Sequence, residues 1–182
     1  MMLEDYVVEK YNYMLHTLQV SNDTVVVNGS IHFKSSTLAH HLSGCTHGAI
    51  MAATLGHEVD RILRQQQYIS MSQALQSDNV ANVLIEALCD KLQEEIAQLA
   101  KAQGYYITAR YSPGYGDFLL EHQNTLLKLS GVKGITLTPS NLLLPQKSVT
   151  AIIGFKKEPP ILTAHKCDNC NSRHKCNKSA TS

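Results

Sequence analysis

The chain has 182 residues, a length that suits one domain or one domain with a small appendage. It is 43% hydrophobic and 17% charged, and 16 Lys and Arg residues against 15 Asp and Glu residues give a net charge of +1. That balance argues against a nucleic-acid binder, and no apolar run reaches the roughly 20 residues that span a bilayer. Because no signal-peptide pattern opens the sequence, we expect a cytoplasmic protein without nucleic-acid or membrane partners.

The first forty residues predict two helices that flank a hairpin. Apolar residues spaced three and four apart over 3–18 predict an amphipathic helix. Two short β-branched or aromatic runs, 24–27 and 31–33, are separated by an Asn-Gly pair, which is typical of a tight hairpin. Serine at the start of 35–42 can cap a brief helix there.

The middle of the chain predicts one buried strand followed by helices. The segment 48–56 is small and apolar throughout, which favours a buried strand, although a buried helical turn has the same pattern. A polar helix is predicted over 57–67 and a short one near 70–77. The longest helix is predicted over 79–103, capped by a Ser-Asp-Asn sequence at its start.

The sequence after the long helix predicts shorter helices and strands. A strand is predicted over 105–110, a loop over 111–117 and a helix over 119–130 that ends at a glycine. Two further strands are predicted over 134–138 and 147–156. This order of elements indicates an α+β fold with a twisted, mainly antiparallel sheet and packed helices.

Composition divides the chain in two. Residues 1–158 carry the globular pattern, and residues 159–182 form a polar tail rich in Cys and His. We therefore predict an α+β domain over 1–158 and a separate C-terminal tail over 159–182.

The loop after the strand 105–110 has the residues of a binding site. Arg110 has a planar guanidinium whose paired N–H donors suit a carboxylate or phosphate, and Tyr115 has a flat aromatic ring that can form one side of a binding site. Gly114 and Gly116 can adopt positive φ and let a ligand approach the main chain. From spacing alone, the simpler interpretation is favoured, namely a surface turn in which Arg110 contacts Asp117.

The wider sequence supports the binding interpretation. The run that starts at Arg110, Arg-Tyr-Ser-Pro-Gly-Tyr-Gly-Asp-Phe-Leu-Leu-Glu-His-Gln, closely resembles the S-adenosylmethionine-binding segment of the activation (reactivation) domain of cobalamin-dependent methionine synthase. Segments 137–140 and 145–149 downstream are similar to the same domain. Cys45 and the Thr-Leu-Gly turn within 53–56 resemble its short, stand-alone members, so the resemblance spans about residues 40–155.

The resemblance implies a module that acts only together with a corrinoid partner. Such domains bind S-adenosylmethionine over the partner's cobalamin while an electron arrives from a flavodoxin-like donor. Methyl transfer then traps the reduced cobalt and restores a methionine synthase, or a related corrinoid protein, that has stalled as cobalt(II). The task is positioning rather than acid–base catalysis, so we expect no catalytic residue of the chain's own.

The resemblance also assigns ligand contacts. Arg110 should hold the methionyl carboxylate, and the backbone groups of Ser112 and Gly114 should face the adenosyl portion. Tyr115 should lie near the ligand and the corrin. Glu86 should pair with the ligand's ammonium group, although a solvated helix charge explains this residue about equally well; its apolar neighbours favour burial somewhat.

The tail carries a second candidate site. Cys167, Cys170 and Cys176 have the spacing of metal ligands, and two histidines lie beside them. They could hold zinc, or an iron–sulfur cluster with a fourth ligand such as Cys45. Free thiols and a redox disulfide are the alternatives that the sequence leaves open.

Three functional hypotheses follow. The leading one is S-adenosylmethionine binding and reductive methylation of the cob(II)alamin form of a cobalamin-dependent methionine synthase. The second is an iron–sulfur electron-transfer activator of another corrinoid methyltransferase. The third is a non-catalytic small-molecule-binding module of the same fold.

Overall fold

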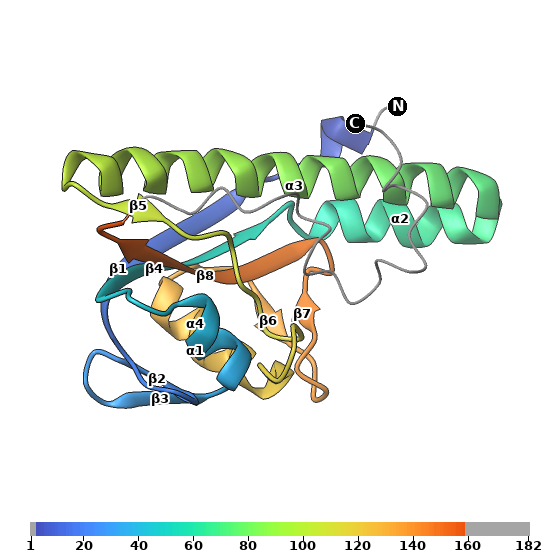
Figure 1. Ribbon diagram of the computed structural model, residues 1–182. Helices are drawn as coiled ribbons and strands as arrows, with labels where there is room; N and C mark the ends of the chain where they lie inside the picture. Colours follow the sequence, from blue (N-terminus) through green and yellow to red (C-terminus); the bar gives the residue numbers. More distant parts are fainter. Residues whose placement is uncertain (1–2, 159–182) are drawn as a thin grey trace, which may run out of the picture.

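The computed structural model describes residues 3–158, which are built around one six-stranded sheet (Figure 1). All of its strand pairs are antiparallel, and their order is β3-β2-β1-β4-β8-β5. The predicted α+β class with a mainly antiparallel sheet is confirmed. The strands are β1 (Lys10–Val20), β2 (Thr24–Val27), β3 (Ile31–Lys34), β4 (His47–Thr54), β5 (Tyr106–Ile107) and β8 (Ser148–Lys156).

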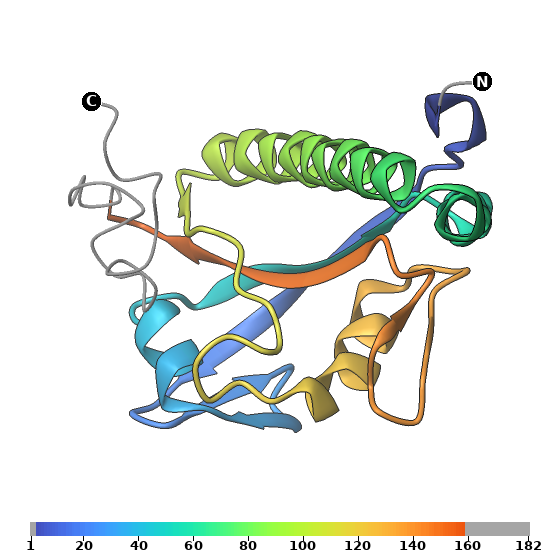
Figure 2. The same cartoon turned by 90° about the vertical axis from the view of Figure 1, so that its right-hand side faces the viewer.

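Elements cover both faces of the sheet (Figure 2). The long helix α3 (Met71–Ala102), the helix α2 (His57–Ile69) and the 3-10 turn η1 (Leu3–Tyr6) lie on one face. Beneath the other face lie α1 (Ser36–His41), η2 (Leu120–His122), α4 (Gln123–Ser130) and the short pair β6 (Thr136–Leu137) and β7 (Leu143–Leu144). The hairpin β2–β3 continues the sheet beyond β1 and curls under this same face. The sheet is therefore the middle of three layers.

The central strands β4 and β8 are buried on both faces because each face has its own core. Ala49, Met51 and Ala53 pack with α2 and α3, whereas Ile50 packs with the layer that contains α1 and α4. A strand buried on both faces is apolar without alternation, which explains the uniform composition of 48–56. The predicted buried strand is confirmed there, and the helical alternative is wrong.

The prediction of a helix over 3–18 is wrong. Only η1 is helical in this segment, and Lys10–Val20 form β1, which pairs with β2 on one side and β4 on the other. The apolar residues of the pattern do not share a buried face, since Tyr11, Met14 and Leu15 are exposed. Pairing with β2 and β4 overrides the three-and-four spacing, because the conformation of a strand depends on the neighbours it packs against.

The predicted break between helices near residue 78 is also absent. α3 runs without interruption from Met71 to Ala102, and Ser70 caps it by accepting a hydrogen bond from the Gln73 amide at 3.4 Å. Asp78, which was expected to cap, lies inside the helix and pairs with Lys147 at 2.8 Å. No proline or glycine interrupts this stretch, so nothing local ends the helix.

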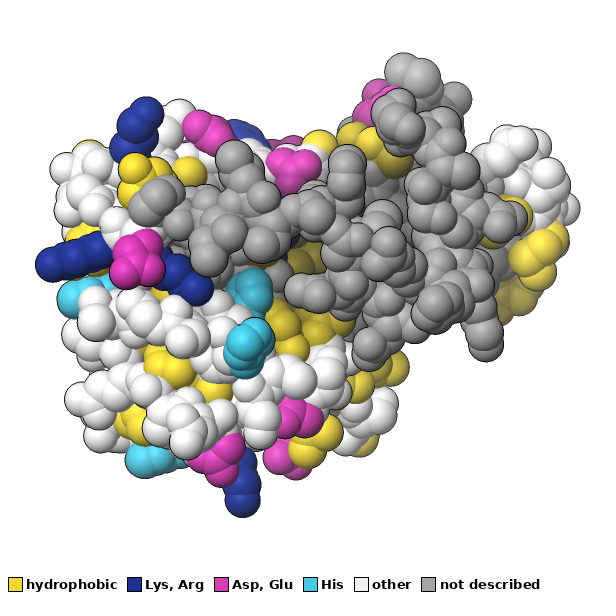
Figure 3. All heavy atoms as spheres, viewed as in Figure 1, with side chains coloured by type: hydrophobic (Ala, Val, Ile, Leu, Met, Phe, Trp, Pro, Cys, Tyr) yellow, Lys and Arg dark blue, Asp and Glu magenta, His cyan; other side chains and the backbone are white. Residues whose placement is uncertain are grey.

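The end where α2 meets α3 presents apolar side chains to solvent. Figure 3 shows hydrophobic side chains at this right-hand end of the molecule. The exposed residues there are Tyr68, Ile69, Met71 and Leu75. This end lies beyond the edge of the sheet, so the sheet does not cover these side chains (Figure 1).

The other local predictions are confirmed, with limits that differ by a few residues. The hairpin β2–β3 turns at Asn28 and Gly29, both with positive φ, and the Ser35 side chain caps α1. The strand 105–110 pairs regularly over two residues only, and the helix 119–130 consists of η2 followed by α4. Gly131 ends α4 in the left-handed conformation, as expected of a helix-terminating glycine.

Candidate functional site

The loop that carries the predicted site lies at the edge of the sheet. After β5 the chain continues along β8, because the Thr108 amide donates to the Gly154 carbonyl at 2.9 Å. Tyr111 and Ile152 then form a bridge, with N–O distances of 3.0 and 2.9 Å. The backbone just before the loop is thus fixed to a buried central strand.

Arg110 points from this edge toward α3. Its two terminal nitrogens donate to Glu86 Oε2 at 2.9 Å and to Asp90 Oδ1 at 2.8 Å. Glu86 and Asp90 are four residues apart, so they lie on the same side of the helix, one turn from each other. The expectation that an ordinary turn would pair Arg110 with Asp117 is wrong, because α3 supplies the partners.

The structure brings Arg110 and Glu86 together, as two contacts of one amino-acid ligand would require. The Glu86 side chain is 63% exposed, so the expectation of burial is wrong and the carboxylate is an exposed helix charge with a cationic partner. Arg110 is only 20% exposed, because its stem is covered while its guanidinium reaches the helix surface.

Ser112, Gly114 and Tyr115 belong to the tight turn that follows. The Tyr115 amide donates to the Ser112 carbonyl at 3.3 Å, and the Phe118 amide donates to the Tyr115 carbonyl at 3.0 Å. The Gly114 amide donates to the Phe118 carbonyl at 2.6 Å. Gly114 has φ of 99°, and an added Cβ would meet only the end of the Leu120 side chain at 3.5 Å, so the main chain here is open to close approach.

Tyr115 stands at the outer end of a row of rings. It is 59% exposed, and its ring meets that of Tyr111 edge-on at 5.8 Å. Tyr111 in turn lies 4.8 Å from the ring of His41, whose Nε2 donates to the Ala109 carbonyl at 2.8 Å. Burial lowers the pKa of His41, so this ring is neutral at pH 7 and supports Tyr111 as an uncharged surface.

Asp117 ties the end of the turn to the start of α1. Its carboxylate accepts hydrogen bonds from the backbone amides of Ser36 and Thr37, at 2.8 and 3.1 Å, and from the hydroxyls of Ser35 and Thr37. These donors lower the pKa of Asp117 well below its ordinary range. Gly116 makes the approach possible, since a Cβ there would lie 2.5 Å from the Thr37 hydroxyl oxygen.

Phe118 anchors the turn from below. It is fully buried, meets Phe33 edge-on at 5.5 Å and stacks on the His122 ring at 5.1 Å. The turn is thus held by Arg110 on α3, by Asp117 on α1 and by Phe118 in the lower core. Sequence reasoning missed Asp90 and the donors at the start of α1, and the only signal for Asp90 was its spacing of four from Glu86.

The cysteines of the described part are core residues. Cys45 and Cys89 are buried, and burial raises the pKa of each thiol to about 11. At neutral pH both thiols are protonated, as expected of cysteines in an apolar core. Residues 3–158 contain no group of three or more His, Cys, Asp or Glu side chains that could hold a metal ion.

The predicted metal ligands Cys167, Cys170 and Cys176 lie outside the described residues, so the tail site and the boundary at residue 158 stay predictions. Among residues 3–158, no helix is long and apolar enough to cross a membrane.

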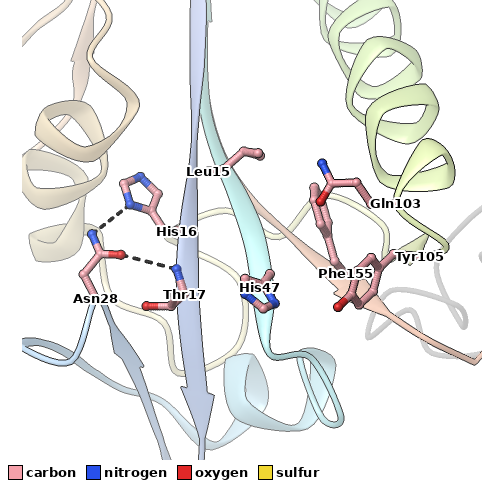
Figure 4. Close-up of a pocket in the computed structure, with 8 residues that line it drawn as sticks. All are labelled: Leu15, His16, Thr17, Asn28, His47, Gln103, Tyr105 and Phe155. Atoms are coloured by element: carbon pink, nitrogen blue, oxygen red, sulfur yellow. Dashed lines mark hydrogen bonds between the residues drawn. The ribbon is translucent and has the colours of Figure 1, made fainter.

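A separate pocket of about 320 Å³ opens where β1 and β4 pass the end of α3 (Figure 4). Its lining residues are Leu15, His16, Thr17, Asn28, His47, Gln103, Tyr105 and Phe155. In Figure 4, the His16 and Asn28 side chains lie on the opposite side of β1 from Tyr105, and the two are hydrogen-bonded at 2.9 Å. None of the predicted ligand contacts lines this pocket.

Comparisons with known proteins support the fold. Comparison of the sequence with known protein families and with curated proteins finds no match. The structure is similar to the crystal structure of the MetH reactivation domain bound to AdoHcy, with a TM-score of 0.62 and 15% sequence identity. The match covers 83% of this chain and 59% of that one, so the chain spans about three-fifths of the length of its structural neighbour. The chain thus has the fold of the MetH reactivation domain.

The Asp117 contact makes a prediction about stability and pH. The pKa of Asp117 is lower in the folded state than in the unfolded state. The contact therefore stabilises the folded protein fully above the ordinary pKa of Asp, about 3.9, and this stabilisation is lost as the pH falls from there toward the folded-state pKa. We expect Asp117→Asn to lower the midpoint of urea unfolding at pH 7, and we expect the gap to wild type to narrow at pH 3.

Asp23→Asn is the matched control, since Asp23 is exposed and accepts one local hydrogen bond from the Thr24 hydroxyl. The assigned contact would be contradicted if Asp117→Asn lowered the urea midpoint equally at pH 7 and pH 3. It would also be contradicted if the decrease at pH 7 were no larger than that of the control.

Proposed function

We propose that the chain binds S-adenosylmethionine at the loop 110–118 and supports reductive methylation of the cob(II)alamin form of a cobalamin-dependent methionine synthase. The observation that carries the proposal is the Arg110–Glu86 ion pair, which stands directly before a turn with open backbone. The fold shared with a reactivation domain bound to AdoHcy, S-adenosylhomocysteine, supports the same reading.

The ion pair matches the amino-acid end of the ligand. A guanidinium has five N–H donors, and the contacts to Glu86 and Asp90 occupy two of them. The remaining donors suffice for a ligand carboxylate, and charge-assisted bonds of this kind are the strong ones. Glu86 then faces the ammonium group that neighbours the carboxylate in every α-amino acid.

The turn suits the adenosyl end. Ser112 and Gly114 present backbone close to the surface, and Gly114 leaves open space where another residue would carry a side chain. Tyr115 adds an exposed aromatic ring, which is a natural surface for a purine or for the edge of a corrin. Its support from Tyr111 and His41 keeps that ring from collapsing onto the turn.

The cobalt chemistry belongs to the partner. When bound to the partner, cobalamin would supply a cobalt centre that, after one electron from a flavodoxin-like donor, could take the methyl group and leave S-adenosylhomocysteine. The residues of this chain bind and orient the methyl donor, and the clamp at Asp117 together with Phe118 limits the freedom of the turn that holds it. In this proposal the chain has no acid–base residue in the reaction.

Calorimetry of S-adenosylmethionine binding tests the assigned role of Arg110. We expect Arg110→Ala to weaken binding by about 2 kcal/mol, roughly thirtyfold, because a charged hydrogen bond to the ligand is lost. Arg61→Ala is the control, since Arg61 pairs with Glu58 and Gln65 on α2, away from the loop. Equal affinity of Arg110→Ala and wild type would refute the role.

Reactivation tests the function itself. A cobalt(II) corrinoid methionine synthase that lacks its own activation domain is incubated with S-adenosylmethionine and a reduced flavodoxin, with and without the chain. We expect methylcobalamin formation, followed by its visible spectrum, to require both the chain and S-adenosylmethionine. Binding of S-adenosylmethionine without any reactivation would instead support the non-catalytic binding module. Reduction of cobalt(II) to cobalt(I) that the chain promotes without S-adenosylmethionine, with no methylcobalamin formed, would support the electron-transfer alternative.

A further inference from the structure

Asp90 is a partner of Arg110 that the proposed ligand contacts leave unused. Its Oδ1 lies 2.8 Å from Nη1 of Arg110, and its side chain is 73% exposed. The charge count around Arg110 is therefore unbalanced, because one guanidinium faces two carboxylates. Within residues 3–158, neither Glu86 nor Asp90 has a second Lys, Arg or His within 4.0 Å.

The resulting local charge of −1 distinguishes between two related ligands. S-adenosylmethionine carries an ammonium, a carboxylate and a sulfonium, which sum to +1. S-adenosylhomocysteine has a neutral thioether in place of the sulfonium and sums to zero. The ligand carboxylate neutralises Arg110 and the ammonium neutralises one acidic side chain, so the second carboxylate is balanced only when the sulfur is charged.

Given the proposed function, on which this step rests, we infer that Asp90 is a specificity-determining residue that favours the charged methyl donor over its neutral demethylated product. The sulfonium is separated from the ligand's α-carbon by only two methylene groups. Asp90 touches the same guanidinium that would hold the ligand carboxylate, and Glu86 lies one turn away on α3, so a sulfur two methylene groups from the α-carbon would be within reach of the Asp90 charge.

The size of the effect follows from exposure. The attraction between two unit charges about 6 Å apart in water corresponds to about a threefold change in affinity. Where less water lies between the charges, the attraction is stronger and the change rises to about tenfold. Since Asp90 is largely exposed, we expect the lower end of this range, with a strong dependence on ionic strength.

Calorimetry with three probes tests the inference. S-adenosylmethionine and sinefungin, an analogue with an amine in place of the methyl sulfonium, both carry the extra positive charge, and S-adenosylhomocysteine does not. We expect wild type to bind the two charged ligands more tightly than the neutral one. Asp90→Asn should reduce this ratio about threefold, and added salt should reduce it in wild type.

The ratio separates specificity from a merely structural contact. If Asp90 only holds Arg110 in place, Asp90→Asn shifts all three affinities equally, the ratio is unchanged and the inference is overturned. Asp90→Glu should keep the ratio, because it keeps the charge. Glu94→Gln is the control, since Glu94 is exposed one turn further along α3 and accepts a hydrogen bond from Gln98 rather than from an arginine.

The outcomes also separate this inference from the proposed function. Wild-type protein that binds none of the three ligands would overturn both. Wild-type protein that binds all three, with a ratio that Asp90→Asn leaves unchanged, would overturn only the role of Asp90.

Discussion

The contact between the Asp117 carboxylate and the start of α1 is the constraint on which the candidate site depends. It joins two segments about eighty residues apart and uses four donors, two from the backbone and two hydroxyls. Together with the buried Phe118 ring it fixes one end of the turn, while the bridge between Tyr111 and β8 fixes the other. A turn held at both ends keeps its backbone exposed and does not fold onto the sheet. Such a preorganised turn lowers the cost of ordering the site when a ligand binds.

Local chemistry made part of this fold predictable. The Asn-Gly hairpin, the serine cap of α1 and the glycine that ends α4 each depend on residues within one turn of each other. β1 could not be predicted in this way, because its identity as a strand is set by β2 and β4 rather than by its own apolar spacing. The residues that pair with Asp117, and the second carboxylate beside Arg110, belong to segments distant in the sequence. The spacing of residues within the loop therefore cannot predict them.

The likeness to a solved structure lies in the fold and not in the overall sequence. At 15% identity the likeness to the MetH reactivation domain rests on the arrangement of sheet and helices, and the sheet owes that arrangement to two cores that each need their own cover. A loop at the edge of such a sheet is free to vary, because only its anchors enter the cores. In this chain the loop and the strand end before it have the cation, the open backbone and the ring that an adenosylated amino acid would use.

A crystal structure of the chain with S-adenosylhomocysteine tests the account most directly. We predict density for the ligand along 112–115, with its carboxylate within hydrogen-bond distance of the Arg110 guanidinium and its ammonium beside Glu86. An empty loop, or a ligand that occupies the pocket lined by His47 and Tyr105 instead, would contradict the account.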